Sequence, residues 1–415
     1  MLLTAMCYFR FMTKKYNSSL GPPVNLRTFA YIIGIGLLGY LFSGSLVFKN
    51  YPVVIKFLEA QPNLDASNEY SKYHYNEKVR ALYVKKANLL DSMRQFTPDT
   101  HAAKTVFRLT IPVIMKLFNL SILQLYYLQL VLGLLICILL SYISFDITRN
   151  YFSTALFTVG IACTYFVKAS FWDSVIWGDT FAYFLLLSAI CFRKNPAVLI
   201  FSVFALFFCD ERGILAISII WACIKFLDRD PDESISFKSL ISFKDNSKYL
   251  VLTIIIGIAL RLFLSYSYGL SLPNSGSKLG YFSAVKYSGD LQLAFFTALG
   301  GFWGIIVLTL AQTVIDKKYV IGIVVAVITC GLAVASAIVF DVTRSITFLV
   351  PICFIPIWYF KGQTSFLSKI LLIVCSINLL YPKTLVILGI PAGIYDSYLF
   401  TKLFKAIDFL SRHLF

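Results

Sequence analysis

The stretch LSILQLYYLQLVLGLLICILLSY (120–142) is apolar along its whole length and contains no charged side chain. An α-helix needs about 20 such residues to cross the hydrocarbon core of a bilayer. Comparable stretches recur before and after it, and together they predict an all-α fold: a polytopic transmembrane helical bundle of about eleven (roughly 10–13) spans. A weaker stretch, 384–400, is expected to re-enter the membrane or to cross it again. The expected spans are 29–48, 120–142, 151–168, 178–192, 196–209, 213–227, 249–268, 291–312, 319–340, 345–360 and 365–381.

The composition of the 415-residue chain supports a membrane location. Hydrophobic residues make up 58% of the chain, charged residues make up 14%, and the mean hydropathy is +0.77. A soluble protein of this length could not bury so much apolar surface in one core. The formal net charge is +16, but the basic residues flank the apolar stretches instead of forming one basic face. This pattern favours contact with anionic lipid and argues against nucleic acid as a partner.

Two features typical of other protein classes are better explained by helix packing. GIGLLG (34–39) matches the GxGxxG fingerprint of dinucleotide-binding folds, but it lies within an apolar stretch, with no strand before it. Small residues at this spacing allow transmembrane helices to approach closely. The nine cysteines form no CxxC pair and mostly lie within apolar stretches. We therefore expect them to be packing residues, and neither disulfides nor a zinc site.

Polarity divides the chain into a basic tail (1–28), a first span (29–48), an outer segment with an amphipathic helix (49–119), a multi-span domain (120–400) and a C-terminal tail (401–415). The positive-inside rule places the N-terminus in the cytoplasm, because each loop on that side then carries Lys or Arg while the short outer loops carry few. The expected location is a bacterial inner membrane. The loops predicted to be cytoplasmic are 143–150, 193–195, 228–248, 316–318 and 361–369.

The same orientation gathers charged residues on the outer face, in FWDSVIWGD (171–179), CDER (209–212) and FDVTR (340–344). Charges beside hydrocarbon are costly unless they are paired or functional. CDER is explained either by an internal Asp–Arg pair or by binding of an anionic headgroup. FWDSVIWGD is explained either by an interfacial aromatic belt or by a sugar site. The candidate substrate-binding residues here are Asp173, Asp179, Asp210, Arg212, Asp341 and Arg344.

The outer segment ends in a predicted amphipathic helix that begins at Thr97, which serves as its cap. Lys104, Arg108 and Lys116 recur at multiples of four residues and would form one cationic stripe. Such a helix would lie in the membrane interface with its cations toward phosphate headgroups. It is either a lipid anchor or a phosphate site for a lipid-linked substrate, and the second alternative makes Lys104 and Arg108 substrate-binding candidates.

Carboxylates of the outer segment are candidates for a general base. Asp99, Asp91 and Asp65 lie in a segment expected beside the bilayer, where a carboxylate could take a proton from a sugar hydroxyl. The alternative for each is a solvated loop charge. No HExxH, GxSxG or Walker motif occurs in the chain. No cofactor is predicted, and a divalent metal is left open. DITR (146–149) repeats the pattern of DVTR (341–344), but its predicted place is the opposite face, in a cytoplasmic turn.

The layout of one span, a long outer segment ending in an amphipathic helix, and then many spans with short loops resembles the GT-C superfamily of membrane glycosyltransferases. FRLTIP (107–112) looks like an Arg-x-x-x-Pro element of uncharacterised bacterial membrane proteins of this type, and DVTR (341–344) looks like theirs. The resemblance implies sugar transfer from a polyprenyl-phosphate donor to a lipid-linked or cell-envelope glycan on the outer face. Asp99 would be favoured as the base, and Arg108, Arg212 and Arg344 would hold the departing phosphate.

Two other functions remain open. A polysaccharide polymerase or ligase also joins lipid-linked glycans outside the membrane, although such proteins usually carry their long outer loops later in the chain. A transporter of lipid-linked glycans would perform no bond chemistry. Transporters tend to have repeated halves and helices broken near the middle of the membrane. In this sequence the ionisable residues lie at span ends, and no inverted repeat is evident.

Overall fold

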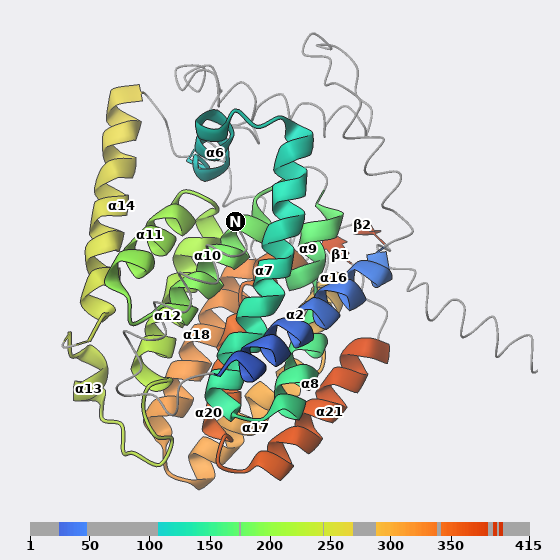
Figure 1. Cartoon of the computed structure of the whole chain (residues 1–415). Helices are drawn as coiled ribbons and strands as arrows, with labels where there is room; N and C mark the ends of the chain where they lie inside the picture. The colour runs from blue at the N-terminus through green and yellow to red at the C-terminus, as the bar shows by residue number, and fades with distance from the viewer. Residues whose placement is uncertain are drawn as a thin grey trace, which may run out of the picture.

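The computed structural model describes residues 25–47, 107–173, 176–243, 245–268, 288–337, 342–380, 385–387 and 390–392, and these form a helical bundle (Figure 1). Five helices are long and apolar enough to cross a membrane, or up to seven if each of two bent helix pairs is one span. The predicted polytopic helical fold is therefore confirmed in this coarser form. The count of eleven spans stays a prediction.

The described helices follow the apolar stretches of the sequence within a few residues. One stretch differs from the all-α expectation: the described part of 384–400 forms two short antiparallel strands that pair Leu385 with Ala392. Whether this stretch re-enters or crosses the membrane stays a prediction. The helices are α2 (Leu26–Val47), α6 (Thr110–Phe118), α7 (Ile122–Thr148), α8 (Tyr151–Ala162), α9 (Tyr165–Trp172), α10 (Asp179–Cys191), α11 (Pro196–Phe207), α12 (Glu211–Phe226), α13 (Phe237–Ile241), α14 (Ser247–Tyr268), α16 (Ser288–Leu299), α17 (Phe302–Ile315), α18 (Tyr319–Ala337), α19 (Val342–Thr347), the 3₁₀ helix η3 (Val350–Cys353), α20 (Phe354–Tyr359) and α21 (Thr364–Leu380), and the strands are β1 (Leu385–Ile387) and β2 (Ile390–Ala392).

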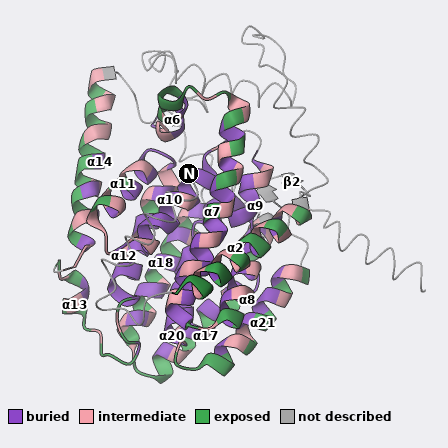
Figure 2. Ribbon diagram, in the orientation of Figure 1, coloured by how far each residue is buried: buried purple, intermediate pink, exposed green. Residues whose placement is uncertain are grey.

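Apolar side chains cover the outside of the bundle. Helices α2, α14 and α18 expose large hydrophobic residues along their outer faces, and Figure 2 shows the exposed faces of α2 and α14. In water such an exposed apolar surface would promote aggregation, whereas the hydrocarbon core of a bilayer solvates it. The structure thus supports a bilayer environment for this chain.

The glycines of GIGLLG (34–39) lie on α2 where it packs against α7 and α8. A Cβ added at Gly36 would come 2.9 Å from the Cα of Ile138, and one added at Gly39 would come 3.1 Å from the Thr158 methyl group. The small residues therefore permit close helix contact, as predicted. The cysteines of the described segments are also unpaired, as expected for packing residues.

Polar side chains close the short turns between helices. Ser121 and Gln124 form a reciprocal capping box at the start of α7. Asn150 caps α8, and Asn195 caps α11 directly before Pro196. Each cap satisfies backbone N–H groups that have no partner within the helix, so the chain can reverse direction within a few residues.

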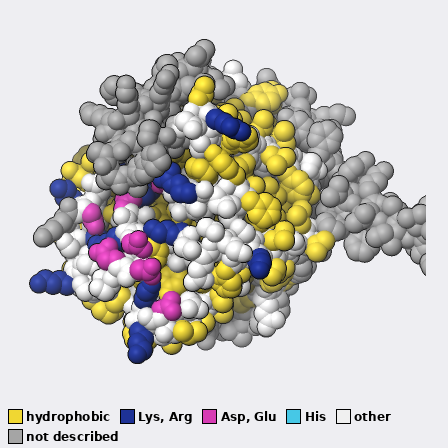
Figure 3. Space-filling view, turned by 60° about the horizontal axis from the view of Figure 1, so that its bottom comes forward, with side chains coloured by type: hydrophobic (Ala, Val, Ile, Leu, Met, Phe, Trp, Pro, Cys, Tyr) yellow, Lys and Arg dark blue, Asp and Glu magenta, His cyan; other side chains and the backbone are white. Residues whose placement is uncertain are grey.

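Basic loops meet at one end of the bundle. Arg193 and Lys194, between α10 and α11, pair with Asp228 after α12. Lys318 pairs with Asp232, and Lys361 and Trp358 donate to the Arg229 carbonyl. Figure 3, with the bottom of Figure 1 turned forward, shows charged side chains gathered on one part of this end. The loops predicted to share the cytoplasmic face thus share one end of the structure.

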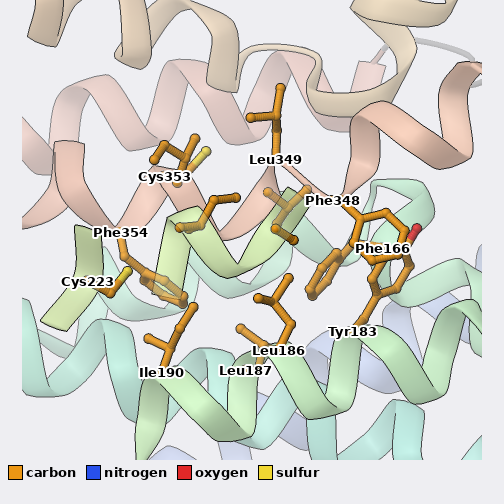
Figure 4. Packing of buried hydrophobic residues seen from close by; sticks show 14 of the residues in the cluster. Phe166, Tyr183, Leu186, Leu187, Ile190, Cys223, Phe348, Leu349, Cys353 and Phe354 are labelled. Atoms are coloured by element: carbon orange, nitrogen blue, oxygen red, sulfur yellow. The ribbon is translucent and has the colours of Figure 1, made fainter. Parts of the chain in front are cut away.

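The core lies where α9, α10, α12 and α19 to α20 pack together (Figure 4). The span Val342–Tyr359 is fully buried, and Phe348 and Phe354 point from it toward α10. Tyr183 of α10 stacks on Phe166 of α9 with ring centroids 4.4 Å apart. This core fixes the ends of four helices relative to each other, and the charged residues predicted from the sequence lie at those ends.

Two bent helix pairs interrupt the bundle. Helices α8 and α9 meet at 52°, and α16 and α17 meet at 85°. Asn378 of α21, 2% exposed, bridges the second break: its Oδ1 accepts from Gly301 N–H at 2.8 Å, and its Nδ2 donates to the Leu299 carbonyl at 3.3 Å and to the Gly160 carbonyl at 3.0 Å. One amide side chain thus satisfies two backbone groups beside the second break and a third, the Gly160 carbonyl, near the end of α8.

Candidate functional site

The candidate site is an ionic network at the helix ends opposite the basic loops. Helices α10, α12 and α19 all begin in this network. Helices α10 and α12, and α20 after α19, end near the basic loops. Asp179 is the first residue of α10, Asp210 caps α12, and Arg344 lies in α19. Acids at helix N-termini are favoured by the helix dipole, which explains why the sequence places them there.

Asp179 lies at the centre of the network and is fully buried. Arg344 donates to both of its oxygens, from Nε to Oδ2 at 2.6 Å and from Nη2 to Oδ1 at 3.0 Å. Arg212 Nη2 donates to Oδ1 at 3.0 Å, and the Tyr165 hydroxyl donates to Oδ2 at 2.9 Å. A carboxylate with this many charged and neutral donors is held ionised despite its burial.

Asp210 forms the second buried centre. Arg212 donates to both of its oxygens, from Nε to Oδ1 at 2.7 Å and from Nη2 to Oδ2 at 2.6 Å. Arg108 Nη1 lies 3.3 Å from Oδ2. Burial alone would raise the pKa of Asp210, but the charges of Arg108 and Arg212 outweigh it and hold the pKa well below its usual value. The predicted Asp–Arg pair within CDER is therefore present, and through Arg212 it continues to Asp179.

Arg108 and Glu211 form the outer edge of the network. Arg108 donates to Glu211 Oε2 from Nε at 3.0 Å and from Nη2 at 2.8 Å. The Arg108 side chain is 14% exposed and that of Glu211 is 37% exposed. Glu211 is thus the acid of the network most open to its surroundings.

Asp173 lies beside the network and is 1% exposed. Its Oδ2 accepts from the Trp177 N–H at 2.7 Å, whereas Oδ1 is buried with no hydrogen-bond partner in the described part of the chain. Burial and the negative charge of Asp179 raise the pKa of Asp173 to about 7. This carboxyl group can therefore change its protonation state near neutral pH.

The turn that carries Asp173 is strained. Ile176 has φ +57, a left-handed conformation that is unusual for a β-branched residue and costs about 1–2 kcal/mol. Gly178 follows with φ +95, and a Cβ there would come 2.9 Å from Ile111 Cδ1. Trp177 stacks on the Arg344 guanidinium at 5.1 Å, so it contributes to the network. Strain of this kind persists where surrounding contacts hold it, often at functional sites.

The raised pKa of Asp173 predicts a pH dependence of stability. A carboxyl group whose folded pKa lies above its unfolded value destabilises the fold as pH rises from the unfolded pKa to the folded one, here from about 4 to about 7, at up to about 1.4 kcal/mol per pH unit. We expect the thermal midpoint of the purified protein to fall between pH 5 and pH 7. Asp173→Asn should lose this slope, and parallel curves for the two proteins would contradict the assignment.

The structure brings together most of the predicted site residues that it describes. Arg108, Asp179, Asp210, Arg212 and Arg344 share one network, and Asp173 lies next to it. DITR is separate: Arg149 pairs with Asp146 at the far end of α7. The candidates that lie outside the described residues are Asp65, Asp91, Asp99, Lys104 and Asp341.

One predicted feature is wrong where it can be tested. The cationic stripe required Arg108 and Lys116 on the same helix, but α6 begins only at Thr110. Arg108 precedes it and turns inward, because the buried acid Asp210 needs a counter-charge. The rest of the predicted interfacial helix, from Thr97, lies outside the described residues.

Two further residues of the network were missed by the sequence interpretation. Glu211 was visible within CDER, and Tyr165 gave no signal beyond an aromatic residue in a span. Arg261 of α14 lies beside the network, with its guanidinium 5.1 Å from the ring centroid of Phe107, and it was missed as well, although a lone cation within an apolar stretch is by itself a sign of function. Among the described residues, no group of three His, Cys, Asp or Glu side chains is placed to hold a metal ion.

No family model, no curated protein and no solved structure matches this chain.

Proposed function

We propose that the protein is a membrane glycosyltransferase of the GT-C type, which moves a sugar from a polyprenyl-phosphate donor to a lipid-linked or cell-envelope glycan at the outer face of a bacterial inner membrane. The observation that carries the proposal is the network of Arg108, Arg212 and Arg344 at one end of a lipid-facing bundle. Guanidinium groups in fixed orientation suit the oxygens of a departing phosphate.

In the proposed reaction, the bond between the anomeric carbon and the phosphate oxygen breaks, and the electron pair leaves with the phosphate. A new bond forms between the anomeric carbon and an acceptor hydroxyl, whose proton passes to a carboxylate. Asp99 is the predicted proton acceptor, and Asp91 and Asp65 are the next candidates. The proposal does not require or exclude a metal ion. The chain's own cations would stabilise the negative charge that develops on the phosphate.

The acids of the network would have a positioning role. Asp179 and Asp210 fix the orientation of Arg344 and Arg212 before any substrate arrives. Donors already aimed at the developing charge cost no reorganisation during the reaction. Arg108 is the cation at the open edge and is therefore the residue expected to meet the phosphate first.

A transporter of lipid-linked glycans is the second candidate, and one observation favours it. The bends of 52° between α8 and α9 and of 85° between α16 and α17 are helix breaks of the kind that transporters use to bind their cargo. The predicted location of the ionisable residues at helix ends favours the transferase. A polysaccharide polymerase or ligase would use the same lipid-linked substrates.

The three functions differ in product. Vesicles containing the full chain are supplied with radiolabelled polyprenyl-phosphate sugar and a cell-envelope acceptor. A transferase releases polyprenyl phosphate with addition of a single sugar, a polymerase extends the glycan stepwise, and a transporter moves the intact lipid without cleavage. Release of polyprenyl phosphate is the expected result, and movement without cleavage would overturn the proposal.

The matched variants for this assay are Arg108→Gln and Arg149→Gln. Arg108→Gln should lower product formation by about a hundredfold, since one charge-stabilising donor typically contributes that much. Arg149 belongs to the exposed pair at the far end of α7, so its replacement should leave the rate unchanged. Equal rates for the two variants would remove Arg108 from the proposed site.

A further inference from the structure

The loop between α12 and α14 contains a short apolar repeat. The sequence ISFK occurs at 235–238 and again at 241–244, and α13 (Phe237–Ile241) extends from one copy to the other. Phe237 is 54% exposed, Ile241 is 70% exposed and Phe243 is 55% exposed. Apolar side chains that are exposed together mark a contact with another surface. These three side chains belong neither to the ionic network nor to the core.

Local contacts hold α13 with its apolar side chains facing outward. Ser236 caps the helix by accepting from the Ser239 N–H at 3.3 Å. Leu240 is 4% exposed and belongs to the core, so it fixes the rotation of α13 about its own axis. Phe237 and Ile241 are four residues apart and therefore share one face of the helix. That face is exposed because Leu240 holds a different face against the bundle.

Lys225, fully buried at the end of α12, fixes the chain that follows α13. Its Nζ donates to the Ser242 carbonyl and, at 2.9 Å, to Asp245 Oδ2. The other oxygen of Asp245 accepts at 3.0 Å from the N–H of Ser247, where α14 begins. One buried cation and one carboxylate therefore tie the end of α13 to the first residue of α14.

The start of α14 sets the depth at which α13 lies in the membrane. Ser247–Ser267 is a candidate span, and Val251, Leu252 and Ile255 are already exposed apolar residues within its first turns. Figure 1 shows α13 at the foot of α14, at the edge of the bundle. The exposed side chains of α13 thus continue the lipid-facing surface of α14 at the level where hydrocarbon gives way to headgroups.

Positive charge accompanies this apolar surface. Lys238 of α13 and Lys248 of α14 are exposed, and Lys248 Nζ lies 5.1 Å from the ring centroid of Tyr249. The only acid between the two lysines in the sequence is Asp245, and it is paired with Lys225. Anionic headgroups complement such a surface, whereas the same surface of a second copy would bring like charges together.

We propose that the segment 235–243 lies in the interface of the leaflet at the basic end of the bundle and binds anionic phospholipid there. Phe237, Ile241 and Phe243 lie among the upper acyl chains. Lys238 lies at the headgroup phosphates. Apolar residues on one side and a cation beside them are typical of interfacial helices. The proposal does not depend on the transfer chemistry, because the ionic network lies at the opposite end of the helices.

Photo-crosslinking of the full chain in vesicles tests the contact. Phe243→p-benzoylphenylalanine places a photoreactive ring on the segment, and Glu233→p-benzoylphenylalanine is the control, since Glu233 is exposed in the acidic turn before α13. We expect a lipid adduct at Phe243 and much less at Glu233. Equal lipid adducts at both positions, or none at Phe243, would overturn the proposal. A crosslink from Phe243 to a second copy of the chain in place of lipid would identify a protein interface instead.

The headgroup preference is tested in vesicles with equal amounts of phosphatidylglycerol and phosphatidylcholine. Mass spectrometry of the adducts at Phe243 should show an excess of phosphatidylglycerol. Lys238→Gln should lower the ratio of the two adducts about fivefold, the effect expected for one Lys near an anionic surface. Lys369→Gln is the matched control, because Lys369 is exposed on α21, away from α13 in Figure 1, and the ratio should not change. Equal adducts of both lipids, or equal effects of the two lysine variants, would contradict binding of anionic lipid by Lys238.

Discussion

Replacing Arg344 with alanine is expected to destabilise the folded protein by about 3–5 kcal/mol, which is the usual cost of removing one partner of a buried ion pair. Arg344 supplies two hydrogen bonds to Asp179. Without them, Asp179 keeps Arg212 and Tyr165 but remains a fully buried carboxylate with half of its charge-assisted bonds. The free energy of unfolding by chemical denaturant, measured in detergent micelles, checks this expectation.

Arg149→Ala is the natural control for this substitution. Arg149 ends the tetrapeptide DITR as Arg344 ends DVTR, and each pairs with an aspartate. The Arg149 side chain is 41% exposed and that of Arg344 is 4% exposed. Exposed pairs contribute at most about 1 kcal/mol, so the two variants should differ clearly. A similar loss for both would contradict the burial-based account of Arg344.

A double replacement separates the folding role of Arg344 from its role in product formation. Asp179→Asn combined with Arg344→Met removes both charges, leaves an oxygen for the Tyr165 hydroxyl, and keeps an unbranched side chain over Trp177. We expect it to recover much of the stability lost in Arg344→Ala, because the buried charge is gone. We expect this double variant, like Arg344→Ala, to form no product. Recovery of product together with stability would show that Arg344 is structural only.

Asn378→Leu is the second large effect that we expect. The substitution removes the partner of Gly301 N–H, the Leu299 carbonyl and the Gly160 carbonyl at once. Each buried backbone group left without a partner costs about 1–3 kcal/mol, and lipid offers no replacement. The expected total is at least about 3 kcal/mol, together with a change in the 85° bend between α16 and α17. Hydrogen exchange at the start of α17 would report that local change.

Ser376→Ala on the same helix is the comparison for Asn378→Leu. Ser376 is partly exposed on α21, and its replacement should cost under about 0.5 kcal/mol, as for most substitutions away from buried polar networks. If Asn378→Leu proved as mild as Ser376→Ala, Asn378 could not be what stabilises the break. If only global stability fell while exchange in α17 stayed unchanged, the effect would not be local to the bend.

Much of the fold was predictable because each apolar stretch carries its own signal. A helix is the structure that satisfies its backbone within one segment in lipid, so stretches such as 249–268 and 319–340 correspond to α14 and α18. The bends were not predictable in the same way. Gly300 at the second bend has φ +58, but the sequence gives no indication that Asn378, far along the chain, supplies the missing partners.

The sequence predicted which charged residues gather on one side of the membrane, but not which of them contact each other. Asp210 with Arg212 could be inferred, because they are neighbours in CDER. The bonds from Arg344 to Asp179 could not, since the two residues are 165 positions apart. The orientation of Arg108 was misjudged, because a repeat of four residues was interpreted as one helix face when the chain starts that helix only at Thr110.

The sequence by itself determined that this is a membrane protein and that its charged residues concentrate at the ends of its apolar stretches, because hydrophobicity and charge act through composition and local spacing. Only the tertiary structure decided which charges meet. Packing of Phe166, Tyr183 and Phe348 aligns the ends of α9, α10 and α19, and this alignment sets Arg344 and Arg212 on Asp179. Pairing between distant charges is a property of the packed core, and no local pattern encodes it.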